Sequence, residues 1–140
     1  MKAIICYLTF SGNTQETAEI IKEELTKRNI NTAMYEIGFG QIPSLDSYDY
    51  IFFGSFTWEQ GSTPDEMKDF VAELGYKPSN VHIFGSGDTQ FGGDDLFCAA
   101  ASKLAKFYNT NSEPLKIEQS PRGRQEQTII KWVDEITKEI

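Results

Sequence analysis

Apolar residues gather along the chain in five short runs, which are separated by segments with a different spacing of apolar positions. The five runs are Lys2–Leu8, Asn31–Ile37, Tyr48–Ser55, Asn80–Gly85 and Pro114–Glu118. From Ile4 to Leu8 and from Ile51 to Phe53, polar residues do not alternate with apolar ones. This pattern is typical of strands that are covered on both faces, as in a parallel sheet. The runs therefore predict five buried strands.

Between the runs, apolar residues recur every three or four positions, which is the spacing of one face of an α-helix. Four such segments are marked by Ala18, Ile21 and Leu25, by Met67, Phe70, Val71 and Leu74, by Leu96, Ala100, Leu104 and Phe107, and by Ile129, Trp132, Val133, Ile136 and Ile140. The third helix is expected from about Asp95 to Tyr108. The alternation predicts one α/β domain, residues 1–140, with a doubly wound parallel sheet of five strands. Such sheets bind ligands at the carboxyl ends of their strands.

The loop after the first strand is Thr9-Phe10-Ser11-Gly12-Asn13-Thr14, and it leads directly into a helix. A helix N-terminus offers free N–H groups and a partial positive charge, which together suit a phosphate. Hydroxyl groups add donors, and glycine lets the backbone approach closely. No lysine is present, so this is not a P-loop. A polar turn in which Asn13 or Thr14 simply caps the helix is the alternative.

The loop after the third strand is Ser55-Phe56-Thr57-Trp58-Glu59-Gln60-Gly61-Ser62. A tryptophan at the carboxyl end of a strand is well placed to stack on a planar ring. The alternative is that Trp58 folds back over the core.

The loop after the fourth strand, Gly85 to Asp95, holds four glycines and one aromatic residue. Ser86, Gly87 and Asp88 could offer backbone groups to the edge of a heterocycle, and Phe91 could supply a second aromatic face. A G-x-G-x-x-G dinucleotide motif is excluded, because position 90 is glutamine. A flexible surface turn is the alternative.

The net charge limits the class of partner, and the cysteine content indicates the cellular compartment. The net charge of −8 disfavours nucleic acid and anionic membranes as partners and favours proteins with a basic docking face. No stretch approaches the roughly 20 apolar residues of a membrane span. The first residues are typical of a strand rather than a signal peptide, and the two cysteines are not spaced as a redox pair. We therefore expect a protein of the reducing cytoplasm.

With these three loops in this order, the chain resembles the flavodoxins of the short-chain type. The loop from Thr9 to Thr14 is similar to the family's phosphate loop, Trp58 with Gly61 to its tryptophan loop, and Gly85–Asp88 followed by Cys98 to its second flavin loop. The resemblance implies strand order 2-1-3-4-5 and non-covalent flavin mononucleotide (FMN). The implied FMN-binding residues are Thr9, Phe10, Ser11, Gly12, Asn13, Thr14, Ser55, Phe56, Thr57, Trp58, Glu59, Gly61, Ser86, Gly87, Asp88, Phe91, Asp95 and Cys98.

The resemblance further implies a monomeric, low-potential electron carrier rather than an enzyme, which shuttles single electrons between a reductase and acceptor redox proteins. Three positions depart from the family pattern. Ser11 and Phe91 stand where threonine and tyrosine are usual, and Glu59 follows Trp58 where several members have glycine. Since that peptide turns toward flavin N5 on reduction, a residue other than glycine makes the turn costlier by roughly 0.5–1 kcal/mol.

Two related functions stay open at this point. An FMN-dependent NAD(P)H reductase would need a second pocket over the flavin, and a dedicated activator of one metalloenzyme would look much like a general carrier. A phospho-receiver domain is excluded, because Thr9-Phe10 and Gly54-Ser55 stand where its acidic residues belong. His82, Cys6, Cys98, Tyr7 and Trp132 are expected to have structural roles.

Overall fold

Strands and helices alternate along the chain as the sequence predicts, apart from the second and third strands, which follow one another directly. The structure is a computed structural model and describes residues 1–57, 61–87 and 98–138. Its elements are β1 (Lys2–Tyr7), α1 (Asn13–Lys27), β2 (Asn31–Glu36), β3 (Tyr50–Phe56), α2 (Asp65–Leu74), β4 (Val81–Gly87), α4 (Ala99–Tyr108), β5 (Leu115–Glu118) and α5 (Arg124–Thr137). Each predicted strand is present, with ends that differ by up to two residues from the apolar runs.

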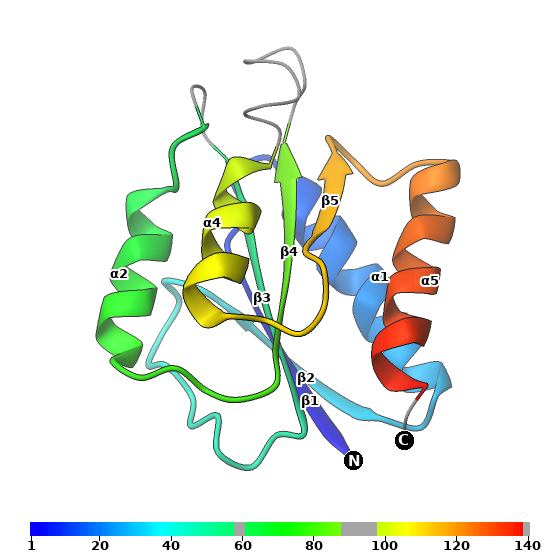
Figure 1. The fold of residues 1–140 in the computed structure, drawn as a ribbon, viewed down its shortest axis with the longest axis horizontal. Helices are drawn as coiled ribbons and strands as arrows, with labels where there is room; N and C mark the ends of the chain where they lie inside the picture. The colour runs from blue at the N-terminus through cyan, green and yellow to red at the C-terminus, as the bar shows by residue number, and fades with distance from the viewer. Residues whose placement is uncertain (58–60, 88–97, 139–140) are drawn as a thin grey trace.

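The five strands form one parallel sheet in the order β2-β1-β3-β4-β5 (Figure 1). The predicted order is therefore confirmed. In the central register, Ile5 of β1 stands between Met34 of β2 and Phe52 of β3. Since β1 has β2 on one side and β3 on the other, the direction of winding reverses between β1 and β3. The carboxyl ends of these two strands are where such folds bind ligands.

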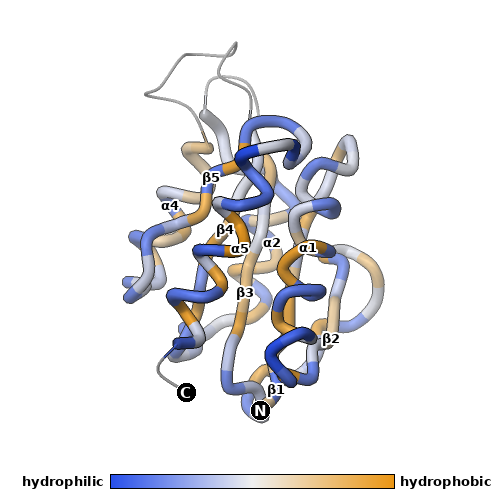
Figure 2. The backbone as a smooth tube through the Cα atoms, turned by 90° about the vertical axis from the view of Figure 1, so that its right-hand side faces the viewer, coloured by the Kyte–Doolittle hydropathy of each residue, from blue (hydrophilic) through white to orange (hydrophobic). Residues whose placement is uncertain are grey.

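Helices cover both faces of the sheet, and the sheet separates the core into two clusters (Figure 1). Successive strand residues point to opposite faces, so Phe53 packs in the cluster that includes Met67 and Phe70 of α2, whereas Phe52 packs in the cluster with Ile129 of α5. Figure 2 shows that hydrophobic residues follow the strands, while the helices alternate between hydrophobic and hydrophilic positions. Both faces of the sheet are therefore buried, as the uninterrupted apolar runs predict.

Helix α4 corrects one detail of the sequence analysis. The side chain of Phe107, which we expected to point inward, is 47% exposed, and Tyr108 is buried instead. Ala100, Ala101 and Leu104 define the buried face of the helix, and Tyr108 extends that face one turn beyond Leu104. The expected start of this helix at Asp95, and the inward position of Leu96, lie outside the described residues.

The residues expected to be structural are placed in or against the core. Tyr7 and His82 are each 6% exposed, and Trp132 packs against the cluster that contains Phe52. Cys6 and Cys98 are free and buried, and burial raises the pKa of each thiol to about 12. In the described part of the chain, no helix has the length and apolar character needed to cross a bilayer.

Candidate functional site

The loop after β1 delivers an open helix N-terminus to the carboxyl edge of the sheet. Gly12 is the N-cap of α1 in the left-handed region, with φ 96° and ψ −7°, where glycine is unstrained. The Thr9 hydroxyl accepts a hydrogen bond from the Gly12 N–H at 3.0 Å and so closes the turn. No side chain caps α1, and a Cβ built on Gly12 would meet no atom within 4 Å. The first amides of α1 are therefore available to a ligand.

The alternative of a simple capping turn does not match this geometry. Asn13 and Thr14 lie inside α1 rather than at its cap. The Asn13 side-chain oxygen accepts a hydrogen bond from the Ser120 hydroxyl at 2.7 Å. Ser11 is exposed in the turn, and the side chain of Phe10 is 74% exposed. An exposed hydroxyl, an amide nitrogen and the first-turn N–H groups together form a set of donors suited to an anion.

A buried hydroxyl pair joins the first loop to the end of β4. The side chains of Thr14 and Ser86 are 1% and 2% exposed, and their hydroxyl oxygens lie 2.7 Å apart, within hydrogen-bond distance. The Ser86 carbonyl in turn accepts a hydrogen bond from the Thr57 N–H at 3.2 Å. Residues from all three predicted loops therefore meet at one place. The Thr14 hydroxyl thus makes a hydrogen bond inside the protein, and its part in binding a ligand stays a prediction.

The start of α4 is fastened to the same edge. The Thr57 hydroxyl accepts the Ala100 N–H at 3.1 Å, and the Cys98 thiol lies 3.7 Å from the carbonyl oxygens of Gly85 and Ile117. A Cβ built on Gly87 would come within 3.0 Å of the Cys98 backbone nitrogen, so this close approach needs glycine. Ser55 is fully buried, and its hydroxyl donates to the Phe56 carbonyl at 2.8 Å. Ser55 therefore shapes the strand end, and its part in binding a ligand stays a prediction.

Two aromatic rings lie together at the edge. The ring centroids of Phe10 and Phe56 are 5.9 Å apart and the rings are tilted by 44°. Gly61 is buried, and its carbonyl accepts a hydrogen bond from the Lys103 side chain at 2.9 Å. The implied positions of Trp58, Glu59, Asp88, Phe91 and Asp95 lie outside the described residues, so their part in the site stays a prediction.

The loop after β5 adds residues that the sequence analysis missed. Besides the contact from Ser120 to Asn13, the Arg122 guanidinium lies 3.3 Å from the Glu16 carboxylate in the first turn of α1. The signal that could have found these residues is topological: the carboxyl end of the fifth strand lies at the same edge as the other three loops. In the described residues, no cluster of histidine, cysteine and acidic side chains could hold a metal ion.

Comparison with known proteins decides the family. The sequence model of the flavodoxin family matches residues 5–111, which includes the phosphate-loop motif, the second half of β1 and all the elements from α1 to α4. The chain belongs to the flavodoxin family. A relative described as probable flavodoxin 2 of Bacillus subtilis is 30% identical over 146 residues, and the alignment covers 98% of this chain and 95% of the relative.

Solved flavodoxin structures share the fold over its full length. The oxidised flavodoxin 2 of Bacillus cereus superposes with a TM-score of 0.87 at 29% identity and covers 100% of both chains. The flavodoxin of Fusobacterium nucleatum, solved bound to FMN, superposes with a TM-score of 0.74 at 16% identity and covers 99% of this chain and 98% of its own. At that identity the second comparison concerns the fold alone.

Proposed function

We propose that this flavodoxin binds one FMN non-covalently at the carboxyl edge of the sheet and carries single electrons between redox proteins. The observation that carries the proposal is the open N-terminus of α1, begun by Gly12 and bordered by the exposed Ser11 hydroxyl. Family membership supports the same cofactor and the same kind of activity. Bound FMN supplies one-electron chemistry that amino-acid side chains do not provide.

The phosphate is held mainly by neutral donors in this proposal. The amides of Asn13 and Thr14, the Ser11 hydroxyl and the Asn13 side-chain nitrogen surround the start of α1, where the helix dipole favours an anion. Thr9 and Thr14 act through the protein, by closing the turn and by joining it to Ser86. The loop itself contains no lysine or arginine.

The residues that flank the flavin ring are proposed from the sequence alone. Trp58 and Phe91 are proposed to lie on its two sides, and the backbone near Thr57, Gly87 and Cys98 to face its edge. Of the other implied positions, Phe10, Ser55, Phe56 and Gly61 support these loops. The acidic residues Glu59, Asp88 and Asp95 would raise the free energy of an anionic reduced ring, since like charges repel, and so lower its potential.

Phosphate recognition is tested by titrating the flavin-free protein with FMN and with riboflavin, which lacks the phosphate, while following flavin fluorescence. We expect FMN to bind at least tenfold more tightly, because hydrogen bonds to a charged group are worth roughly 1.5–3 kcal/mol each. Ser11→Asp places a negative charge in the exposed turn and should weaken FMN but not riboflavin. Ser79→Asp is the matched control, because Ser79 is exposed and precedes β4 at the opposite edge. Equal affinity for the two flavins would refute the phosphate site.

The carrier role is tested by mixing the FMN-loaded protein anaerobically with NADPH, first alone and then with a basic flavodoxin reductase. We propose a cytoplasmic monomer that is reduced only when the reductase is present, and more slowly as salt is raised, because salt screens attraction between charged surfaces. Bleaching of the flavin by NADPH alone would instead identify an NAD(P)H-dependent reductase. Reduction by the reductase at a rate indifferent to salt would remove the acidic docking face from the proposal.

A further inference from the structure

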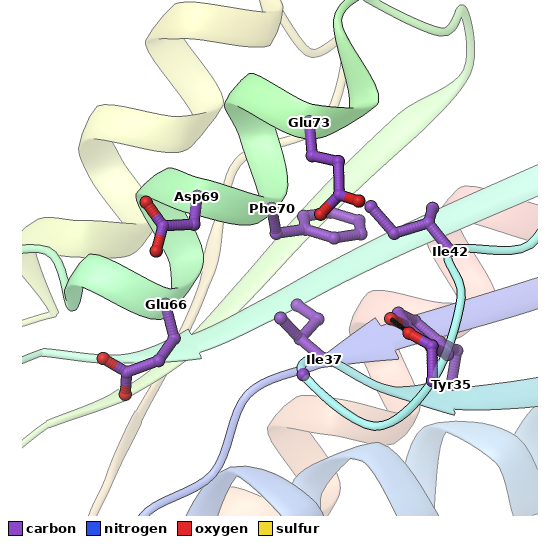
Figure 3. A pocket seen from close by; sticks show the side chains of 9 residues that line it. Tyr35, Ile37, Ile42, Glu66, Asp69, Phe70 and Glu73 are labelled. Carbon is purple, nitrogen blue, oxygen red and sulfur yellow. Dashed lines mark hydrogen bonds between the residues drawn. The ribbon is translucent and has the colours of Figure 1, made fainter.

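A groove runs between α2 and the connection that follows the carboxyl end of β2, and it is lined by residues other than those proposed to bind FMN (Figure 3). It encloses about 250 Å³, and its apolar lining comes from Ile37, Ile42 and Phe70. A second hollow of about 330 Å³ shares Ile42 and Glu73 with the first and continues along the same helix. The two hollows therefore form one extended depression beside α2.

The helical wall of this groove is acidic. Glu66, Asp69 and Glu73 all line it from α2, and Figure 3 shows the Glu73 carboxylate beside Ile42. Lys68 follows Glu66 by two positions, about 200° around the helix, and is not among the lining residues. No lysine or arginine occurs between Asn29 and Met67. Within the described ranges, the ion pairs leave these three carboxylates unpaired.

An exposed aromatic ring stands at the rim of the groove. Phe39 is 71% exposed and lies between Gly38 and Gly40, which both line the groove and have φ angles of 95° and 89°. The Tyr35 hydroxyl donates to the Gly40 carbonyl at 3.0 Å and ties the turn to β2. Exposed aromatic side chains beside a hollow are frequent anchors in protein interfaces. The groove thus combines an apolar floor with a row of unpaired negative charges, and the turn beside it carries an exposed aromatic side chain.

These features select one kind of occupant. The sign of the charge disfavours nucleic acid and anionic lipid, and in residues 1–57, 61–87 and 98–138 no set of side chains could chelate a metal ion. A simple cation would use the carboxylates but not Phe39 or the apolar floor. We propose that the groove docks a segment of a partner protein in which lysine or arginine residues alternate with apolar residues, a contact separate from the proposed FMN site.

The test uses the full chain and a synthetic peptide, acetyl-Arg-Leu-Lys-Leu-Arg-amide, in an NMR titration of backbone amides. Shift changes are expected to concentrate in residues 37–42 and 66–74. The triple variant E66Q/D69N/E73Q should weaken peptide binding about tenfold, because each exposed charge pair can change affinity up to about fivefold. Phe39→Ser, at an exposed position, should weaken it several-fold. FMN affinity should be unchanged in both variants, which separates this proposal from the cofactor proposal.

Control variants distinguish peptide binding in the groove from general electrostatic attraction of a basic peptide to an acidic protein. The triple variant E19Q/E126Q/E135Q removes the same charge from exposed positions of α1 and α5, on the opposite side of the sheet, and should leave peptide binding nearly unchanged. Spermine, a cation without apolar side chains, should not reproduce the pattern of shifts. Equal weakening by the two triple variants, shifts spread over both sides of the sheet, or binding that is unaffected by Phe39→Ser would each overturn the proposal.

Discussion

Replacing Thr14 with valine removes one hydroxyl of the buried pair that joins the start of α1 to the end of β4, while the shape of the side chain is kept. The Thr14 and Ser86 oxygens lie 2.7 Å apart, and both side chains are almost fully buried. The single variants Thr14→Val and Ser86→Ala each leave one hydroxyl without a partner and without water, which costs about 1–3 kcal/mol of unfolding free energy. The double variant removes both polar groups and should lose less than the sum of the singles.

Urea unfolding of the flavin-free chain, followed by circular dichroism, measures the free energy of unfolding of the wild type, the two single variants and the double variant. We expect a coupling free energy between the two residues of about 1 kcal/mol or more, since residues in direct hydrogen-bond contact couple by roughly 0.5–3 kcal/mol. Single effects that add to within about 0.3 kcal/mol would show that the two hydroxyls do not depend on each other, and the account of this contact would be refuted.

The same variants separate two ways in which Thr14 can serve FMN. Its backbone N–H survives in Thr14→Val, and its hydroxyl faces Ser86. We therefore expect the ratio of FMN to riboflavin affinity to change less than about threefold. A hydroxyl that donated to phosphate would be worth roughly 1.5–3 kcal/mol, so a loss of tenfold or more in that ratio would show direct contact with the phosphate.

Three further outcomes follow from single contacts. Burial lowers the pKa of His82 from 6.5 to about 4. The stability that the neutral ring supports is therefore complete above pH 6.5 and is lost as the pH falls toward 4, by up to about 3 kcal/mol. The urea midpoints of wild type and His82→Gln should converge over this range, and parallel pH profiles would contradict the lowered pKa. Gly85→Ala places a Cβ 2.8 Å from that of Ala101 and should lower the free energy of unfolding in urea by about 1–3 kcal/mol. Adding Ala101→Gly should recover part of this loss, and wild-type stability of Gly85→Ala would contradict the predicted clash. Arg122→Gln removes the partner of Glu16 and should weaken FMN about two- to fivefold at low salt; an equal effect on riboflavin would show that the phosphate is not involved.

Much of the fold follows from local pattern, because parallel strands buried on both faces need continuous apolar runs. Ile51 to Phe53 form such a run, and the structure places Phe52 and Phe53 in the two opposite core clusters. Ile129 and Val133, one helical turn apart, both face the sheet from α5. Strand order, by contrast, depends on contacts between distant segments, and here it came from the family resemblance rather than from spacing.

The spacing of apolar residues could not predict contacts between residues that are far apart in the sequence. Phe107 and Tyr108 are both aromatic, and the structure buries Tyr108 on the same helix face as Ala101, which lies close to Gly85 of β4. The hydrogen bond between Ser120 and Asn13 joins residues 107 positions apart, so no window along the chain contains both. The Thr14 hydroxyl was grouped with the ligand donors on composition, and Ser55 was implied by the family resemblance. Their internal hydrogen bonds, to Ser86 and to the Phe56 carbonyl, were not predicted.

The absence of lysine from the first loop has a physical consequence for how an anion is held there. Arg122 brings a positive charge to the start of α1, but Glu16 in the same turn brings a negative one, and the two carry no net charge as a pair. What remains is the dipole of α1, equivalent to about half a unit charge at its N-terminus, and N–H groups with fixed directions. The grip on a phosphate then depends on backbone geometry, which Gly12 sets through its left-handed conformation. At the proposed site the neutral loop and the acidic surface are therefore compatible, because oriented hydrogen bonds would bind the anion and the surface charge would remain available to a basic partner.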